Sequence, residues 1–95
     1  KRAKYTTSAR KMPSLIQTAG LIQALVFIES RDTTGQQFCD DMATIYGEHD
    51  RETLRAKVQK AGLERYLALS RDMIAVSIWM RRFAQIELGE EVDES

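Results

Sequence analysis

The sequence predicts an all-α fold: a single compact helical bundle of about five helices with a long C-terminal helix. Apolar residues recur three or four positions apart along most of the chain, and no segment alternates with period two. A hydrophobic fraction of 43% in 95 residues suffices for one modest core. We expect residues 1–89 to form one helical domain and residues 90–95 to form an acidic tail.

A first helix is expected before Pro13, where apolar residues have helical spacing: Tyr5, Ala9 and Met12. Pro13 disfavours a helical conformation at the residue before it and suits the first position of a helix. A new helix, or a sharp kink, is therefore expected at Pro13. Alternatively, Ser14 and Gln17 fit a capping box for the second helix.

The second helix, residues 15–28, is apolar in nearly every direction and is predicted to form the core together with the C-terminal helix. The uncharged stretch around it has only 17 residues, 12–28, and includes several polar ones, so it does not predict a membrane span. Gly20 costs about 1 kcal/mol of helix stability relative to alanine. It marks either a close approach of another helix or a tolerated defect.

The third and fourth helices are predicted from capping residues and narrow apolar stripes. Thr34 and Gln37 fit a capping box, and Gly47 is positioned to end the third helix, whose stripe is Phe38, Met42, Ile45 and Tyr46. Asp50 is expected to cap the fourth helix and Gly62 to end it. The stripe of the fourth helix is Leu54, Val58 and Ala61.

The long C-terminal helix is expected over residues 63–88, which contain no proline or glycine. Its wide apolar stripe predicts a helix covered from several sides; the stripe comprises Tyr66, Leu69, Met73, Val76, Met80 and Phe83, widened by Leu67, Ile74 and Ile78. Trp79 falls on the remaining face, between Ala75 and Arg82, among charged and small residues. It is the candidate partner-interface residue, unless another helix of the chain covers it.

Catalytic chemistry has few candidates in this sequence, and we expect no enzyme activity, catalytic residue, metal or cofactor. The single cysteine, Cys39, is expected to be a small buried residue, which suggests a reducing, cytoplasmic setting. The only histidine, His49, falls in a turn and is expected to be exposed. Asp40 and Asp41 are adjacent on a helix and point about 100° apart, which is poor geometry for sharing a metal or a proton.

Charge is unevenly distributed along the chain. The 14 Lys/Arg and 14 Asp/Glu residues cancel, but the last nine positions hold five of the acidic residues and no basic one. Residues 1–86 therefore carry a net charge of +5 and residues 87–95 a charge of −5. A basic body is compatible with polyanion binding, and also with an ordinary solvated surface.

Two alternative functions remain open from the residues alone. Segments 36–46 and 51–61 have the lengths of a helix-turn-helix DNA-binding unit, with Arg51 and Arg55 available to a groove. Acidic residues crowd the start of the would-be recognition helix and favour an ordinary helical hairpin: Glu48, Asp50 and Glu52. The other alternative is a helical adaptor that binds only proteins.

Two segments resemble a known family. Residues 12–21, MPSLIQTAGL, with ALVF at 24–27, resemble a "P-x-L-I-x-x-x-G-L … A-L-A-F" signature of the small α-helical subunit of the type III-B CRISPR Cmr effector complex. Residues 78–84, IWMRRFA, are similar to the C-terminal "W-L-K-R-F-A" run of that family, in the same order and at a similar separation. Three positions depart mildly from the pattern: Ile22, Met80 and Arg81.

The resemblance implies a non-catalytic structural subunit of an RNA-guided, RNA-targeting ribonucleoprotein in antiviral defence. Copies of such a subunit stack into a filament beside the backbone subunits, in a complex that also contains a large subunit. The filament lines the groove that holds guide RNA and target RNA, and no membrane is involved. The candidate RNA-binding residues of this chain are Arg10, Lys11, Arg71, Arg81 and Arg82.

Overall fold

The computed structural model describes residues 2–87, which form five α-helices. The helices are α1 (Arg2–Ala19), α2 (Leu21–Arg31), α3 (Thr33–Tyr46), α4 (Arg51–Lys60) and α5 (Leu63–Glu87). The predicted all-α class, the number of helices and the long final helix are thus confirmed. The predicted acidic tail, residues 90–95, lies outside the described residues.

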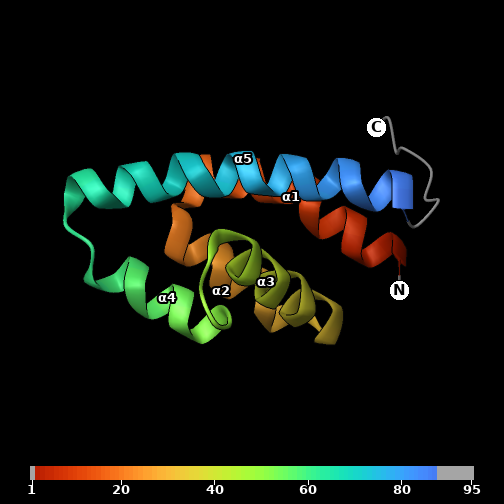
Figure 1. The fold of residues 1–95 in the computed structure, drawn as a ribbon, viewed down its shortest axis with the longest axis horizontal. Helices are drawn as coiled ribbons and strands as arrows, with labels where there is room; N and C mark the ends of the chain where they lie inside the picture. The colour runs from red at the N-terminus through yellow and green to blue at the C-terminus, as the bar shows by residue number, and fades with distance from the viewer. Residues whose placement is uncertain (1, 88–95) are drawn as a thin grey trace.

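The two longest helices, α1 and α5, run antiparallel side by side, and α2, α3 and α4 lie on one side of this pair (Figure 1). Helix α3 lies centrally, because it packs against each of the other four helices. Fully buried apolar side chains from all five helices form the core, among them Met12, Leu21, Leu25, Ile28, Phe38, Met42, Leu54, Leu69 and Met73. The candidate site lies between α1 and α5.

The prediction that a new helix begins at Pro13 is wrong, since α1 continues through Pro13 to Ala19. Met12 and Ile16, one on each side of this proline, are both buried in the core. Their burial outweighs the hydrogen bond that proline removes from the helix. Ser14 does not act as a cap either, because it lies inside α1 and its carbonyl oxygen accepts a hydrogen bond from Thr18 Oγ1.

The break between the first two helices falls instead at Gly20, whose φ of 93° favours glycine. Gly20 supplies no capping side chain to α2, and the Tyr66 hydroxyl oxygen of α5 takes over, accepting a hydrogen bond of 2.8 Å from Leu21 N. A Cβ on Gly20 would lie 3.1 Å from that oxygen. The predicted close approach of another helix to Gly20 is therefore confirmed.

We predict that Tyr66→Phe lowers the free energy of unfolding by about 1–2 kcal/mol, because it leaves the part-buried Leu21 N–H without its acceptor. Tyr46→Phe is the matched control, since the Tyr46 hydroxyl donates only an exposed bond of 3.1 Å to Asp72. Its expected loss is about 0.5 kcal/mol or less. Urea denaturation followed by circular dichroism measures both, and equal losses in the two variants would rule out the capping role of Tyr66.

The predicted caps of the middle helices are partly right. Asp32, not Thr34, caps α3, because the Asp32 side chain accepts a hydrogen bond from Gly35 N. Gly47 ends α3 with a φ of 102°, as predicted. Asp50 caps α4, also as predicted. The prediction that Gly62 ends α4 is wrong, since α4 ends at Lys60 and Ala61 is its extended cap residue.

Helix α5 is not covered from several sides, which corrects the expectation from its wide stripe. Leu69, Met73 and Met80 are buried against the core. Much of the rest of the stripe is exposed, including Leu67 (48%), Ile78 (44%) and Phe83 (49%). The reason lies in the packing: α5 lies at the edge of the bundle against α1 and α3, so only one side of it is covered.

None of the described helices combines the length and apolarity needed to cross a membrane.

Candidate nucleic-acid interface

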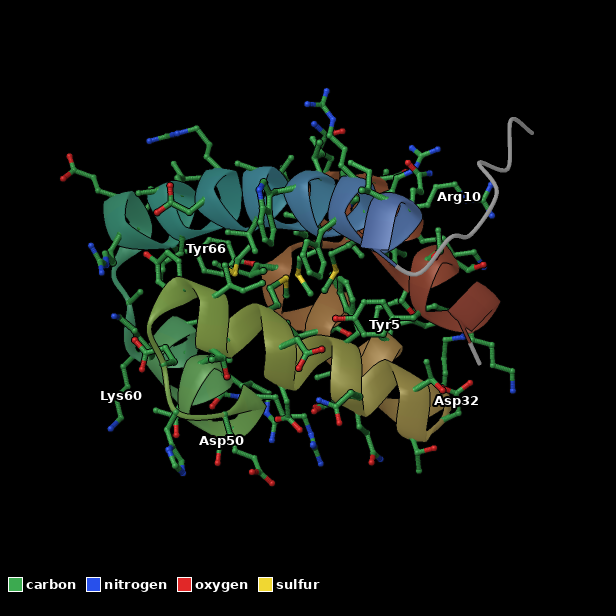
Figure 2. All side chains as sticks on the ribbon, turned by 45° about the vertical axis from the view of Figure 1, so that its right-hand side comes forward. Tyr5, Arg10, Asp32, Asp50, Lys60 and Tyr66 are labelled. Carbon is green, nitrogen blue, oxygen red and sulfur yellow. The ribbon has the colours of Figure 1, made fainter. Side chains whose placement is uncertain are left out.

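Three of the predicted RNA-binding arginines converge on one groove. Arg10 of α1 and Arg81 and Arg82 of α5 line a groove of about 220 Å³ between the two helices, together with Ala9, Pro13, Ile78 and Gln85. We call this set of residues the basic groove. Figure 2 shows Arg10 beside the C-terminal end of α5.

The antiparallel packing of α1 and α5 explains this convergence. It brings the middle of α1 to the last turns of α5, although Arg10 and Arg81 are separated by most of the sequence. Two small residues, Ala9 and Ala84, are buried in this region and let the helices approach closely. Arginines that flank such a close contact project from both helices toward the same opening.

The described lining of the basic groove contains no carboxylate. Within residues 4–86, whose side chains are described, neither Arg81 nor Arg82 forms a salt bridge. The groove also holds a hydrogen-bond donor without a described acceptor, the buried Nε2 of Gln85. Its apolar lining residues suit the aliphatic stems of arginines whose guanidinium groups reach outward. A site of this kind favours anionic ligands.

The other two predicted RNA-binding residues lie outside the basic groove. Lys11 is exposed on α1 and Arg71 is exposed on α5. Arg71 shares a helical ridge with Arg82, about three turns and roughly 16 Å away along the axis. Lys11 and Arg71 are therefore exposed basic residues of the two helices that do not line the groove.

An apolar groove adjoins the other flank of α5. Trp79 is 53% exposed, and its ring stacks on Phe83 with centroids 5.3 Å apart and planes at 14°. These rings and Ile45 of α3 line a groove of about 330 Å³, completed by Tyr5, Asp41, Thr44 and Met80. We call it the aromatic groove. Trp79 lies on the exposed face of α5 with Ala75 and Arg82, as predicted, and no described helix covers it. Its neighbours in the aromatic groove are largely apolar.

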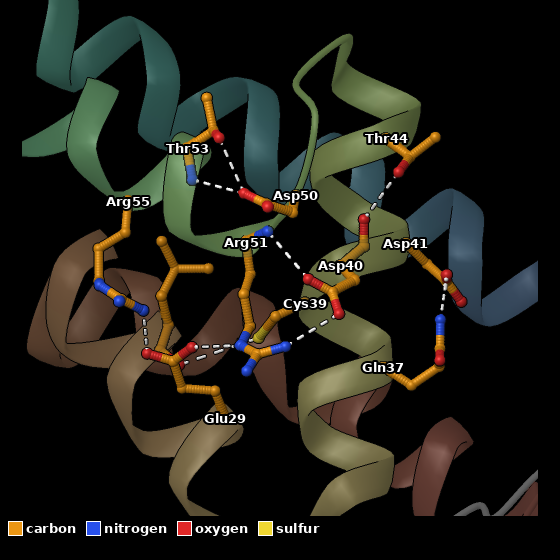
Figure 3. A network of polar contacts seen from close by, with 11 residues as sticks. Glu29, Gln37, Cys39, Asp40, Asp41, Thr44, Asp50, Arg51, Thr53 and Arg55 are labelled. Atoms are coloured by element: carbon orange, nitrogen blue, oxygen red, sulfur yellow. Dashed lines mark hydrogen bonds and ion pairs between the residues drawn. The ribbon is translucent and has the colours of Figure 1, made fainter.

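The two basic residues on which the helix-turn-helix hypothesis depends, Arg51 and Arg55, form ion pairs within the chain. Arg51 Nε lies 3.0 Å from a carboxylate oxygen of Glu29, and Arg51 Nη1 donates a bond of 2.9 Å to Asp40 (Figure 3). Arg55 Nη1 pairs with the same Glu29. These ion pairs fasten α4 to α2 and α3, with the Glu29 side chain only 16% exposed. Arg51 and Arg55 thus serve the fold, and the ordinary helical hairpin is favoured.

Among the side chains considered for catalysis, Cys39 is buried, and Asp40 and Asp41 are hydrogen-bonded to other side chains. Burial raises the pKa of the Cys39 thiol to about 12, so it stays protonated and unreactive. Asp40 pairs with Arg51, whereas Asp41 accepts hydrogen bonds from Tyr5 Oη (2.6 Å) and Gln37 Nε2 (2.8 Å). The described part of the chain contains no cluster of three or more His, Cys, Asp or Glu side chains suited to a metal.

Sequence and structure comparisons agree with one another. The sequence model of the CRISPR-associated protein (Cas_Cmr5) family matches residues 1–87. The CRISPR system Cmr subunit Cmr5 of Thermus thermophilus is 37% identical over 90 residues, which cover 94% of this chain and 79% of that protein. The crystal structure of a CRISPR-associated Cmr5 family protein from the same organism superposes with a TM-score of 0.84, at 38% identity, covering 90% of this chain and 77% of that one.

Proposed function

Because the chain belongs to the Cmr5 family, the small subunits of the type III-B CRISPR Cmr complex, we propose that it is a non-catalytic, RNA-facing structural subunit of that complex. In this proposal, copies of the chain stack into a filament within an RNA-guided, RNA-targeting ribonucleoprotein of antiviral defence in the cytoplasm. The filament contacts the backbone and large subunits and borders the guide and target RNA.

The convergence of Arg10, Arg81 and Arg82 on the basic groove carries the RNA part of the proposal. RNA duplexes are recognised mainly by shape and by contacts to phosphates and 2′-hydroxyls. Arginine suits phosphate because its planar guanidinium donates two parallel hydrogen bonds. Lys11 and Arg71 would contact further phosphates along the same face.

The aromatic groove is the proposed contact with a neighbouring subunit. We predict that Trp79→Ala weakens incorporation into the Cmr complex about tenfold or more, because aromatic anchors dominate interface energies. The melting temperature should change little, since the ring is 53% exposed. Leu63→Ala is the control: Leu63 is 74% exposed at the other end of α5, and incorporation should be unaffected. A steep drop in melting temperature with normal incorporation would make Trp79 a folding residue.

The proposal also requires that the subunit itself cuts nothing. We predict that the purified chain cleaves neither RNA nor DNA in the presence of magnesium or manganese, because its described residues contain no cluster of three or more His, Cys, Asp or Glu side chains suited to a metal. Labelled RNA incubated with the chain and resolved on denaturing gels measures this. Cleavage that survives repurification and is lost in His49→Ala or Asp41→Asn would contradict the non-catalytic assignment.

Membership in the complex is tested by purification from native cells. An affinity-tagged chain, expressed at its natural level, should co-purify with the other Cmr subunits in fixed proportion and with a short guide RNA. Recovery of the chain free of both, or bound to double-stranded DNA of a preferred sequence, would overturn the proposal. The DNA result would favour a regulator instead.

A further inference from the structure

We propose that the aromatic groove binds an arginine side chain presented by a neighbouring protein subunit. Its guanidinium group would stack against the rings of Trp79 and Phe83 and donate hydrogen bonds to the Asp41 carboxylate. That the arginine belongs to another subunit rests on the proposed function. The preference of the groove for a guanidinium group does not, because it follows from the groove residues alone.

Asp41 is a partly buried carboxylate without a cationic partner. Within residues 4–86 it accepts hydrogen bonds from two neutral groups, Tyr5 Oη and Gln37 Nε2, and forms no salt bridge. Three other partly buried carboxylates each contact an arginine or a lysine: Glu29, Asp40 and Glu48. A carboxylate that loses water on binding is stabilised more by a cation than by neutral donors. The charge of Asp41 therefore favours a cationic ligand in this groove.

The aromatic wall of the groove favours a flat cation. The rings of Trp79 and Phe83 stack with nearly parallel planes, so each ring covers only one face of the other. Both side chains remain about half exposed. The faces of aromatic rings attract cations, and a guanidinium group stacks on them because it is planar. Arginine therefore suits this wall better than the compact ammonium group of lysine.

The Asp41 carboxylate is held in place before any ligand arrives. Tyr5 Oη donates a hydrogen bond to one of its oxygens and Gln37 Nε2 to the other. Each oxygen keeps a second lone pair and can accept a further hydrogen bond. The Tyr5 ring packs edge-on against the buried Phe38, with ring centroids 5.4 Å apart, which fixes Tyr5 relative to the core. Such preorganisation lowers the entropic cost of binding.

The size and charge of the aromatic groove favour one basic side chain over RNA or a whole helix. Its volume of about 330 Å³ is at the lower end of ligand pockets, which span roughly 300–1,000 Å³. Its described lining contains one carboxylate and no lysine or arginine, so it repels a phosphate backbone. The basic groove has the reverse composition, three arginines and no described carboxylate. In this proposal, α5 separates a surface for anions from a surface for a cation.

The first test uses the isolated full chain and the fluorescence of Trp79, its only tryptophan. The probe is a capped Gly-Arg-Gly peptide, and its matched control is Gly-citrulline-Gly, whose side chain has a similar shape and no charge. We expect a saturable change in emission with the arginine peptide, which should bind about fivefold or more tightly than the citrulline peptide. Equal responses to the two peptides, or no saturable response, would overturn the proposal.

Asp41→Asn tests the role of the carboxylate. Asparagine keeps an oxygen that can accept the Tyr5 hydrogen bond, so the fold should persist, which circular dichroism checks. Asp72→Asn is the matched control, because Asp72 also accepts a tyrosine hydrogen bond, from Tyr46, and does not line the groove. We expect Asp41→Asn to weaken binding of the arginine peptide about fivefold or more, and Asp72→Asn to leave it unchanged. Equal affinities of the two variants would contradict a role for Asp41.

The second test identifies the occupant in the assembled complex. Photoreactive p-benzoylphenylalanine replaces Thr44, an exposed groove residue that contributes neither a ring nor a charge. We expect illumination to link this position to a protein segment that contains an arginine. Changing that arginine to glutamate should weaken incorporation of the subunit about tenfold, and Asp41→Arg in this chain should restore part of the loss. Cross-links to RNA, or to a segment in which no arginine affects incorporation, would overturn the proposal.

The two tests separate this inference from the proposed function. If the chain does not co-purify with the other Cmr subunits but binds the arginine peptide as expected, the proposed function fails together with the assignment of the arginine to a Cmr subunit. The guanidinium site itself then stands. If the chain joins the complex but does not distinguish arginine from citrulline, this inference fails and the proposed function stands.

Discussion

Replacing Gly35 with alanine is expected to destabilise the protein by about 3 kcal/mol or more, because overpacking against backbone leaves little room to relax. Gly35 is buried in the first turn of α3, where α3 meets α2. A Cβ there would overlap the carbonyl oxygen of Ile28 and lie 3.1 Å from its carbonyl carbon. Since both are backbone atoms of α2, the two helices would have to separate, opening the core around Phe38.

Urea denaturation measures the loss, and Gly62→Ala is the matched control. A Cβ on Gly62 would meet nothing within 4 Å, and Gly62 has no positive φ. Its stability should change by about 0.5 kcal/mol or less. If Gly35→Ala unfolded at the same denaturant concentration as the control, the close packing of α2 on α3 would be incorrect.

Reversing the charge of Arg81 and Arg82 together is expected to weaken target-RNA binding by the reconstituted complex about tenfold or more at moderate salt. Both side chains line the basic groove, and the double change replaces attraction to phosphates by repulsion. The slope of log affinity against log salt concentration should also become shallower, by the amount expected for the loss of about two phosphate contacts. Arg81→Glu with Arg82→Glu is first checked by circular dichroism for an intact fold and by gel filtration for incorporation.

Lys60→Glu with Arg65→Glu provides an equal change of charge away from the groove, at exposed positions of α4 and α5. This control should retain more of the RNA affinity and most of the salt dependence. If the Arg81 and Arg82 variant matched the unmodified subunit in both affinity and salt slope, with the subunit incorporated, these arginines would not face the RNA.

Local sequence rules predict a helix end correctly where interactions between neighbouring residues determine that end. Asp50 and Gly47 act at the helix ends as their chemistry requires. The prediction of a new helix at Pro13 is wrong, because it considers only the local cost of proline in a helix. The burial of Met12 and Ile16, which offsets that cost, depends on the packing of the whole fold. The break at Gly20 depends on Tyr66, 45 residues away from its hydrogen-bond partner Leu21, and helical periodicity contains no such information.

The candidate site was predictable only in part for the same reason. The adjacent pair Arg81 and Arg82 is visible in the sequence, but its meeting with Arg10 depends on the antiparallel packing of α1 and α5. The spacing of Phe83 fits the apolar stripe and predicts a covered position, yet α5 lies at the edge of the bundle and leaves Phe83 49% exposed. Its stacking on Trp79 could have been suspected from their i, i+4 spacing.

Ultraviolet cross-linking of the assembled Cmr complex to its guide and target RNA tests the central claim most directly. Peptides of this subunit that carry cross-linked nucleotides are identified by mass spectrometry after nuclease and protease digestion. We predict that they come from segments 9–13 or 78–85, which contain the residues that line the basic groove, and that the cross-linked positions are among Arg10, Arg81 and Arg82. Cross-links confined to the segment around Arg51 and Arg55 would contradict an RNA-facing role for this groove. The same role would be contradicted if this subunit were present in the complex but carried no cross-link while the backbone subunits did.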